Sequence, residues 1–233
     1  MSALLIKYLM LNKKDSILAV DADPNSTLHE VLGMKNVDTM AGVVEDISKH
    51  MDKIPSGMTK DRFITMRVQE TLVEEKEFDL LAMGRPEGPG CYCYVNNLLR
   101  EIIAKVTKNY KFVVIDNAAG MEHISRRTMR VIDKLVLVSD DSAVGIRSVK
   151  RIYDLANELG IKVGGVFFIV NKLKDSIGAL EGEIQKTGLA FAGSIPYDEE
   201  LHKSSVDGKS IFEVNSPLAS DAMGKIFDNL IKR

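Results

Sequence analysis

The chain has 233 residues, a formal net charge of -2 and 45% hydrophobic residues, which is long enough and apolar enough for a large α/β domain with its own core. The near-neutral charge and the lack of a basic run argue against nucleic acid as the main partner. No apolar stretch approaches the ~18 residues of a membrane span, so we expect no membrane association.

The hydrophobic pattern predicts strands that alternate with amphipathic helices along the chain. A helix over residues 2–13 precedes an apolar strand over 16–21, and a polar, partly helical stretch over 35–76 leads to a strand over 78–83. The remaining predicted elements are a helix over 94–108, a strand over 112–116, a helix to about 132, a strand over 135–138, a helix over 144–159, a strand over 166–171, a helix near 176–187, a strand over 191–195 and two short C-terminal helices.

Apolar strands in alternation with helices predict an α/β fold, with a mostly parallel sheet that helices cover on both faces. The sequence has no internal repeat, low-complexity tract or linker, so we expect a single domain over 1–233. In such sheets the ligand binds at the carboxyl ends of the strands. Asp21, Asp23, Asp116 and Asn171 all fall at these ends, which makes them candidate site residues.

Cys91 and Cys93 are the only cysteines, and they follow a loop rich in glycine and proline. The C-x-C spacing does not favour a disulfide, but it can place two thiolates on one soft metal ion. Since a tetrahedral site needs four ligands, a second copy of the chain across a two-fold axis would complete it. The alternative is a pair of inert loop cysteines. Without a disulfide framework or an export signal, we expect a cytoplasmic protein.

Four further segments resemble the motifs of the MinD-type P-loop nucleoside triphosphatases, which have a deviant Walker A motif. They are residues 20–25 (switch I), 113–120 (Walker B and switch II), 170–172 (the adenine-reading Asn) and 194–198 (the proline loop). With the Cys91-Tyr92-Cys93 segment added, the chain resembles the nickel-insertion accessory ATPases that mature carbon monoxide dehydrogenase. The resemblance implies a P-loop NTPase architecture of the SIMIBI, MinD-like type.

The resemblance also implies roles for the residues at the phosphate end of the site. Asp23 would position the attacking water as ATP closes the dimer. Asp116 would hold Mg²⁺ through a water molecule, and Asp21 would lie close to Mg²⁺ or to a lysine. A turn-forming Asp before Pro24 and a structural strand-end carboxylate are the alternatives for Asp23 and Asp116.

For the base, the resemblance implies that Asn171 reads the adenine edge and that the Lys172 stem packs over it. Pro196 and Tyr197 would line the base. The implied ligands are ATP or ADP with Mg²⁺, and Ni²⁺ or Zn²⁺ on Cys91 and Cys93. The implied partners are a second copy of the chain, bound through the nucleotide face and the C-x-C arm, and carbon monoxide dehydrogenase as the client.

The family's first strand and its Gly-Lys-Gly-Gly-Val-Gly-Lys-Thr-Thr phosphate loop have no counterpart in these 233 residues. We therefore expect a sheet with its N-terminal strand missing and a poor ATPase, whether the start was misplaced or the loss is real. A degenerate metal-binding paralogue that does not hydrolyse ATP is one alternative. A MinD/ParA-like partitioning ATPase is another, disfavoured because no basic membrane helix or DNA-binding patch is present.

Overall fold

The computed structural model describes residues 1–233 except 51, 53, 86–100, 119–130 and 233. The chain forms two compact units. The β1 unit consists of Ser2 and residues 9–118, and the β6 unit consists of Met1, residues 3–8 and residues 119–233. Each unit is described by itself, and a single domain over the whole chain remains a prediction.

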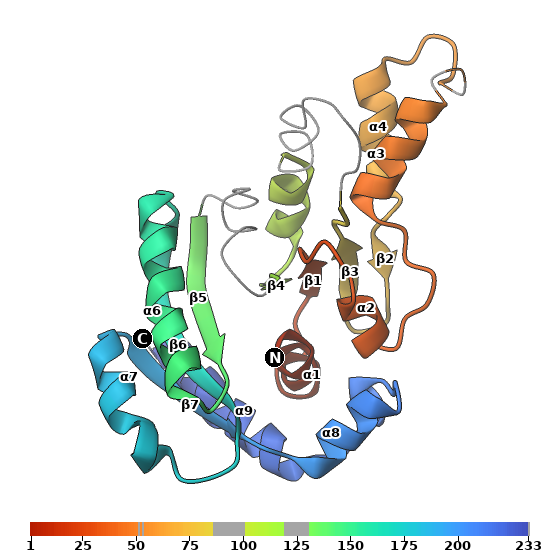
Figure 1. Ribbon diagram of the computed structural model, residues 1–233. Helices are drawn as coiled ribbons and strands as arrows, with labels where there is room; N and C mark the ends of the chain where they lie inside the picture. The colour runs from red at the N-terminus through yellow and green to blue at the C-terminus, as the bar shows by residue number, and fades with distance from the viewer. Residues whose placement is uncertain (51, 53, 86–100, 119–130, 233) are drawn as a thin grey trace. The chain divides into compact units, whose positions relative to one another are not determined.

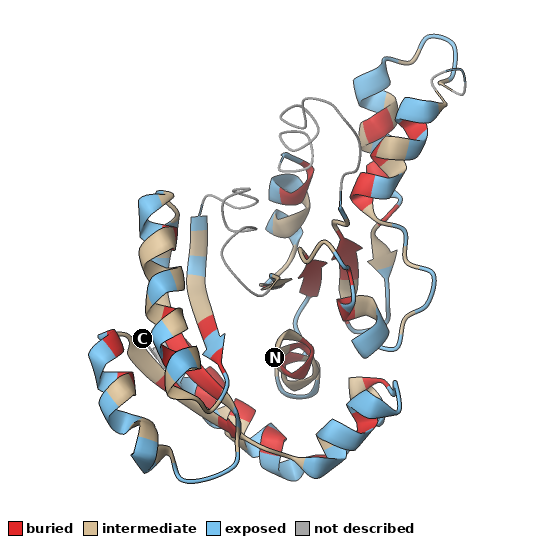
Figure 2. Cartoon of the chain, viewed as in Figure 1, coloured by how far each residue is buried: buried red, intermediate tan, exposed pale blue. Residues whose placement is uncertain are grey.

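The β1 unit contains a four-stranded sheet in the order β2-β3-β1-β4. Strand β1 (Ile17–Asp21) pairs in parallel with β3 (Asp79–Ala82) and with β4 (Phe112–Asp116), while β2 (Val73–Glu74) is antiparallel to β3. All five residues of β1 are buried, as Figure 2 shows, and β1 has a neighbouring strand on each side. The three longer strands confirm the predicted strands, with small shifts at their ends.

The helices of this unit confirm a partly helical stretch between β1 and β3 (Figure 1). They are α2 (Leu28–Val31), α3 (Met40–Lys49) and α4 (Lys60–Gln69). Threonine caps α3 and α4, since Thr39 Oγ1 accepts the Gly42 N–H at 3.1 Å and Thr59 Oγ1 accepts the Arg62 N–H at 3.4 Å. Of the helix predicted over 94–108, the described part is helical at 101–106 and continues as a 3₁₀ turn, η2 (Thr107–Asn109).

The β6 unit contains a parallel three-stranded sheet in the order β5-β6-β7. Its strands are β5 (Val131–Ser139), β6 (Lys162–Leu173) and β7 (Ala190–Pro196). Its helices are α6 (Ala143–Glu158), η4 (Ile177–Leu180), α7 (Glu181–Thr187), α8 (Glu199–Val206), η5 (Ile211–Glu213) and α9 (Pro217–Lys232), and α1 (Ser2–Asn12) contributes residues to both units.

Alternate residues of β6 pack into two separate cores, one on each face of this sheet. Phe167 and Ile169 lie in a core with residues of α1, β7 and α9. Phe168 and Val170 lie in a core with residues of β5, α6 and α7. This two-residue period follows from the strand backbone, which points successive side chains to opposite faces. The prediction of a parallel sheet with helices on both faces is confirmed here.

Several predicted bounds are wrong, and the strands predicted over 135–138 and 166–171 start four residues too late, since β5 begins at Val131 and β6 at Lys162. The helix expected to end near Ile132 cannot do so, because Val131 and Ile132 already belong to β5 and pair with Lys162 and Val163 of β6. The last helix, α9, has 16 residues and is not short. Among the helices in the described part of the chain, none is both long enough and apolar enough to cross a membrane.

Candidate functional site

Two carboxylates lie next to each other at the carboxyl ends of neighbouring strands in the β1 unit. Asp21 and Asp116 are the last residues of β1 and β4, and they are direct partners in the parallel register. Neighbouring strands lie about 4.8 Å apart, so the two side chains start within interaction range. Asp23 follows two residues later, and its charge also acts on Asp21. The structure thus brings together the three carboxylates that the sequence singled out.

Asp21 is fully buried, with 0% of its surface exposed. Its Oδ1 accepts the Asp23 N–H at 3.1 Å, and its Oδ2 accepts the Leu28 N–H at 2.9 Å. Burial raises the pKa of Asp21, and the negative charges of Asp116 and Asp23 raise it further against the opposing effect of the two hydrogen bonds. A cation beside these groups would relieve that repulsion.

The loop that carries Asp23 is a tight turn. Asp23 Oδ1 accepts the Asn25 N–H at 2.8 Å, and the Asp23 carbonyl accepts the Ser26 N–H at 2.9 Å. Ser26 is buried and adopts a left-handed backbone with φ 47°, which is uncommon for a residue with a side chain. Strained backbone of this kind persists only where its surroundings hold it, and it concentrates at functional loops.

Asp116 has a hydroxyl partner that the sequence did not indicate. The Ser2 hydroxyl donates a hydrogen bond to Asp116 Oδ1, and the backbone carbonyl of Asp116 accepts the Ala22 N–H at 2.8 Å. Carboxylate oxygens are the ligands that Mg²⁺ prefers, so the donor set fits this ion. Within the described residues, however, no group of three His, Cys, Asp or Glu side chains could hold a metal ion by itself.

In the β6 unit, Asn171 and Lys172 lie in an irregular part of β6. The pairing with β7 shifts register between Val170 and Leu173, and Lys172 has a left-handed φ of 57°. Bulges of this type are over-represented beside active sites because they redirect side chains. Lys172 is exposed and Asn171 is half-buried, so both side chains are accessible to a ligand.

The proline loop begins directly beside this bulge. Pro196, the last residue of β7, pairs with Leu173, and the Tyr197 N–H donates to the Leu173 carbonyl at 2.7 Å. Lys174 Nζ lies 5.5 Å from the centre of the Tyr197 ring, and the His202 ring lies 5.8 Å from it. The structure therefore brings the four predicted base-binding residues together within the β6 unit and adds Lys174 and His202, which sequence reasoning missed.

Asp198 connects the starts of two helices next to this loop. Its Oδ1 accepts the Leu201 N–H at 2.9 Å at the start of α8, and its Oδ2 accepts the Ser216 hydroxyl. Ser216 Oγ in turn accepts the Ala219 N–H of α9 at 3.1 Å. Burial alone would raise the pKa of Asp198, but the Ser216 and Leu201 hydrogen bonds outweigh it and hold the pKa below its usual value.

We predict that Asp198→Ala destabilises the protein by about 1–2 kcal/mol at neutral pH, because it removes a cap and the bond to Ser216. Since the folded-state pKa is depressed, this contribution is present above the unfolded-state pKa and is lost as the pH falls through the folded-state pKa. Urea unfolding of both proteins at neutral and acidic pH checks this. A difference in unfolding free energy that stays constant with pH would contradict the expectation.

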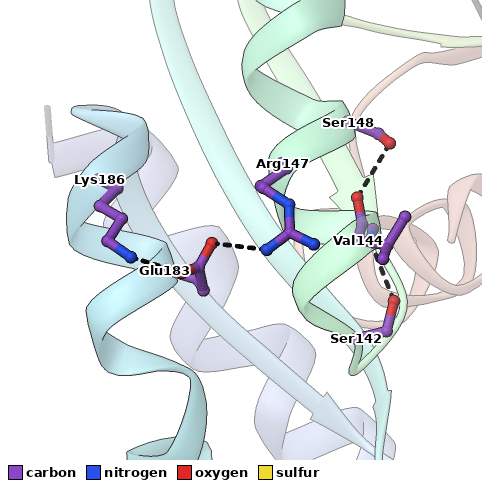
Figure 3. A network of polar contacts seen from close by, with 7 residues as sticks. Ser142, Val144, Arg147, Ser148, Glu183 and Lys186 are labelled. Carbon is purple, nitrogen blue, oxygen red and sulfur yellow. Dashed lines mark hydrogen bonds and ion pairs between the residues drawn. The ribbon is translucent and has the colours of Figure 1, made fainter.

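Arg147 of α6 forms an ion pair within the β6 unit, with Glu183 of α7. Figure 3 shows Arg147 of α6 and Lys186 of α7 on either side of Glu183, at 3.2 Å and 2.6 Å. Hydrogen bonds from Lys186 and Arg147 lower the pKa of Glu183. Ser142 caps α6 by accepting the Gly145 N–H at 3.0 Å. These contacts connect α6 to α7 and leave Arg147 a structural role.

Cys91 and Cys93 lie outside the residues that the structure describes, but the point at which the chain leaves β3 toward them is described. Gly84 there has a left-handed φ of 70°, and a Cβ on it would lie 2.5 Å from Thr39 Oγ1. Only glycine fits such a position without displacing the cap of α3. The metal assignment of the two cysteines remains a prediction.

Comparison with known proteins gives relatives in sequence and in structure. The chain is 44% identical over 210 residues to an ATP-binding protein of Methanocaldococcus jannaschii, covering 89% of this chain and 83% of the relative. It is 26% identical over 230 residues to the carbon monoxide dehydrogenase accessory protein CooC of Rhodospirillum rubrum, covering 93% and 86%. The MinC:MinD cell division complex of Aquifex aeolicus contains a chain with a TM-score of 0.71 at 20% identity, covering 100% and 89%.

The solved structure shares too little sequence to show more than the fold, which is the α/β P-loop NTPase fold of the MinD/ParA type. The sequence matches show the family. Residues 1–211 match the CobQ/CobB/MinD/ParA nucleotide binding domain, which is most of the chain. The protein therefore belongs to the CobQ/CobB/MinD/ParA family of nucleotide-binding proteins.

Proposed function

We propose that this protein is a nucleotide-dependent metal carrier of the type that inserts nickel into carbon monoxide dehydrogenase. One observation carries the proposal: a C-x-C pair stands in a chain of the MinD/ParA family that is also similar to CooC. The name of CooC states its role as an accessory protein of carbon monoxide dehydrogenase. Ni²⁺ is then the cargo, and Zn²⁺ competes for the same sulfurs because thiolates bind both.

Asp21, Asp23 and Asp116 are the residues we assign to the phosphate end of the nucleotide. Asp116 would hold Mg²⁺ through a water molecule, and Asp21, whose two carboxylate oxygens already accept backbone N–H groups, would lie close to the ion without binding it directly. A bound Mg²⁺ supplies neutralisation of phosphate charge. Asp23 lies in a turn directly after β1, and we assign its carboxylate to orient the water that attacks the terminal phosphate.

Asn171, Lys172, Pro196 and Tyr197 are the residues we assign to the adenine base. The bulge in β6 and the pairing of Leu173 with Pro196 support this assignment. The amide of Asn171 and the stem of Lys172 belong to the bulge, and the proline loop begins beside it. An amide can both donate and accept a hydrogen bond, which matches the adenine edge. The pairing also supports contact of the Tyr197 loop with the same ligand.

Cys91 and Cys93 are the residues we assign to the cargo. Two thiolates from each of two chains would give a four-sulfur site, so the carrier acts as a homodimer. ATP binding and hydrolysis would alternate two arrangements of the dimer, and the coupling between nucleotide state and metal affinity would control release to the client.

A second candidate is a metal-binding protein that does not hydrolyse ATP. It shares the C-x-C pair with the first candidate. Because these 233 residues contain no Gly-Lys-Gly-Gly run to surround the phosphates with backbone N–H groups, we expect them to bind Mg-ATP weakly when they are assayed alone. Both candidates require the metal site, and they differ in hydrolysis.

The test is phosphate release at millimolar Mg-ATP, with binding followed by isothermal titration. We predict slow hydrolysis that Asp23→Ala abolishes while nucleotide affinity is unchanged, because the carboxylate acts on water and not on binding. Asp15→Ala is the matched control, since Asp15 is an exposed carboxylate just before β1, at the opposite end of the strand. Hydrolysis that survives Asp23→Ala would refute the role of Asp23. No hydrolysis in the unaltered chain would favour the second candidate.

A further inference from the structure

Asp21 lies directly before the loop of residues 22–28, which carries Asp23, and the backbone of Asp21 is held within the sheet. It ends a strand whose five residues are all buried, and it has a partner on each side, Ala82 of β3 and Asp116 of β4. Its backbone carbonyl accepts the Met83 N–H at 2.8 Å, which extends the pairing with β3. The position of its side chain is therefore set by the centre of the sheet.

The Asp21 carboxylate accepts hydrogen bonds from backbone N–H groups at both ends of the loop of residues 22–28. One oxygen accepts the N–H of Asp23 at the beginning of the loop, and the other accepts the N–H of Leu28 at its end, at 3.1 and 2.9 Å. Leu28 is itself buried, with 4% of its surface exposed. If the carboxylate is removed, the Leu28 N–H loses its hydrogen-bond partner, and the end of the loop is no longer held to β1.

Asp116 does not share this function, although it stands beside Asp21. Its side chain accepts from the Ser2 hydroxyl, and the loop contacts it through the Ala22 N–H and its backbone carbonyl. A side-chain substitution at Asp116 leaves that backbone bond in place. Substitutions can thus distinguish the effect of the Asp21 carboxylate on the loop from that of the Asp116 carboxylate.

We propose that Asp21 is a positioning residue that holds the loop of residues 22–28, and with it the Asp23 carboxylate, in the orientation used for hydrolysis. The anchoring stands on the hydrogen bonds given above, while its consequence for hydrolysis rests on the proposed function. In the described part of the chain, Asp23 uses Oδ1 to accept the Asn25 N–H, so the turn itself fixes the direction of the Asp23 side chain.

Hydrogen exchange of the loop amides tests the anchoring without nucleotide. We expect the Asp23 and Leu28 amides to exchange at least about tenfold faster in Asp21→Ala, and Asp21→Asn to lie in between because its amide oxygen keeps one acceptor. Asp116→Asn is the matched control, since it removes a neighbouring carboxylate but no acceptor of these amides, and exchange should stay within about twofold of the unaltered chain. Unchanged exchange in Asp21→Ala would overturn the proposal.

The consequence for hydrolysis is read from kcat and KM. Asp21→Ala should lower kcat about tenfold or more with little change in KM for ATP, and Asp21→Asn should recover part of kcat. A rise in KM with kcat unchanged would overturn the positioning role. If the unaltered chain shows no hydrolysis, the proposed function fails and the exchange result alone decides the anchoring. If Asp21→Ala does not fold, Asp21→Asn carries both comparisons.

Discussion

Cys91→Ser or Cys93→Ser is expected to abolish metal binding by both chains of the dimer. If each chain supplies two of four sulfurs, one substitution leaves a site with two thiolates, which is a poor site for Zn²⁺ or Ni²⁺. The unaltered protein should bind one ion per two chains, and chelation should return it to monomers. Metal analysis combined with molar mass from light scattering, with and without chelator, measures both quantities.

Tyr92→Phe is the matched control for this experiment, because it changes the residue between the cysteines and keeps both sulfurs and their spacing. It should bind metal with the same stoichiometry. One ion per single chain, or a molar mass that does not change on chelation, would contradict the shared site. Metal binding that persists in Cys93→Ser would show that other residues hold the ion.

The carboxylate cluster of the β1 unit could be predicted because each strand carries its own signal. Asp21 and Asp116 both follow runs of apolar residues, and parallel strands that end in the same layer bring their last residues together. The register between β1 and β4 confirms this alignment residue by residue. Once a parallel sheet is inferred, the carboxylates that meet at its strand ends can therefore be predicted from the sequence of each strand.

Other parts of the candidate site depend on contacts between distant residues and have no local signal. Ser2 and Asp116 are separated by 114 positions, and nothing in the sequence around Ser2 indicates the contact. The left-handed backbone of Lys172 is disfavoured for lysine and follows from the register shift against β7. In the same way, pairing with β6 decides that Val131 belongs to a strand, because apolar residues alone suit either element.

Phe168→Ala is expected to cost about 3–5 kcal/mol of unfolding free energy, which is a large part of the total for most domains. Phe168 is 0% exposed and lies in the core that joins β5, β6, α6 and α7. Its ring centre lies 5.7 Å from that of Phe191 on the neighbouring strand, so truncation also removes an aromatic pair. Urea unfolding followed by circular dichroism gives the free energy and shows whether the slope changes.

The loss of unfolding free energy at Phe168 should grow with the side-chain volume that the substitution removes. Phe168→Leu keeps an apolar side chain in the core and should cost less than Phe168→Ala, since the cavity left behind is smaller. Val206→Ala, at a residue that is 74% exposed at the end of α8, should change stability by no more than about 0.5 kcal/mol. An equal effect of the alanine substitutions at 168 and 206 would refute the placement of Phe168 in the core. Since Phe168 lies three residues before the bulge at Asn171, this core also supports the strand end to which we assign base recognition.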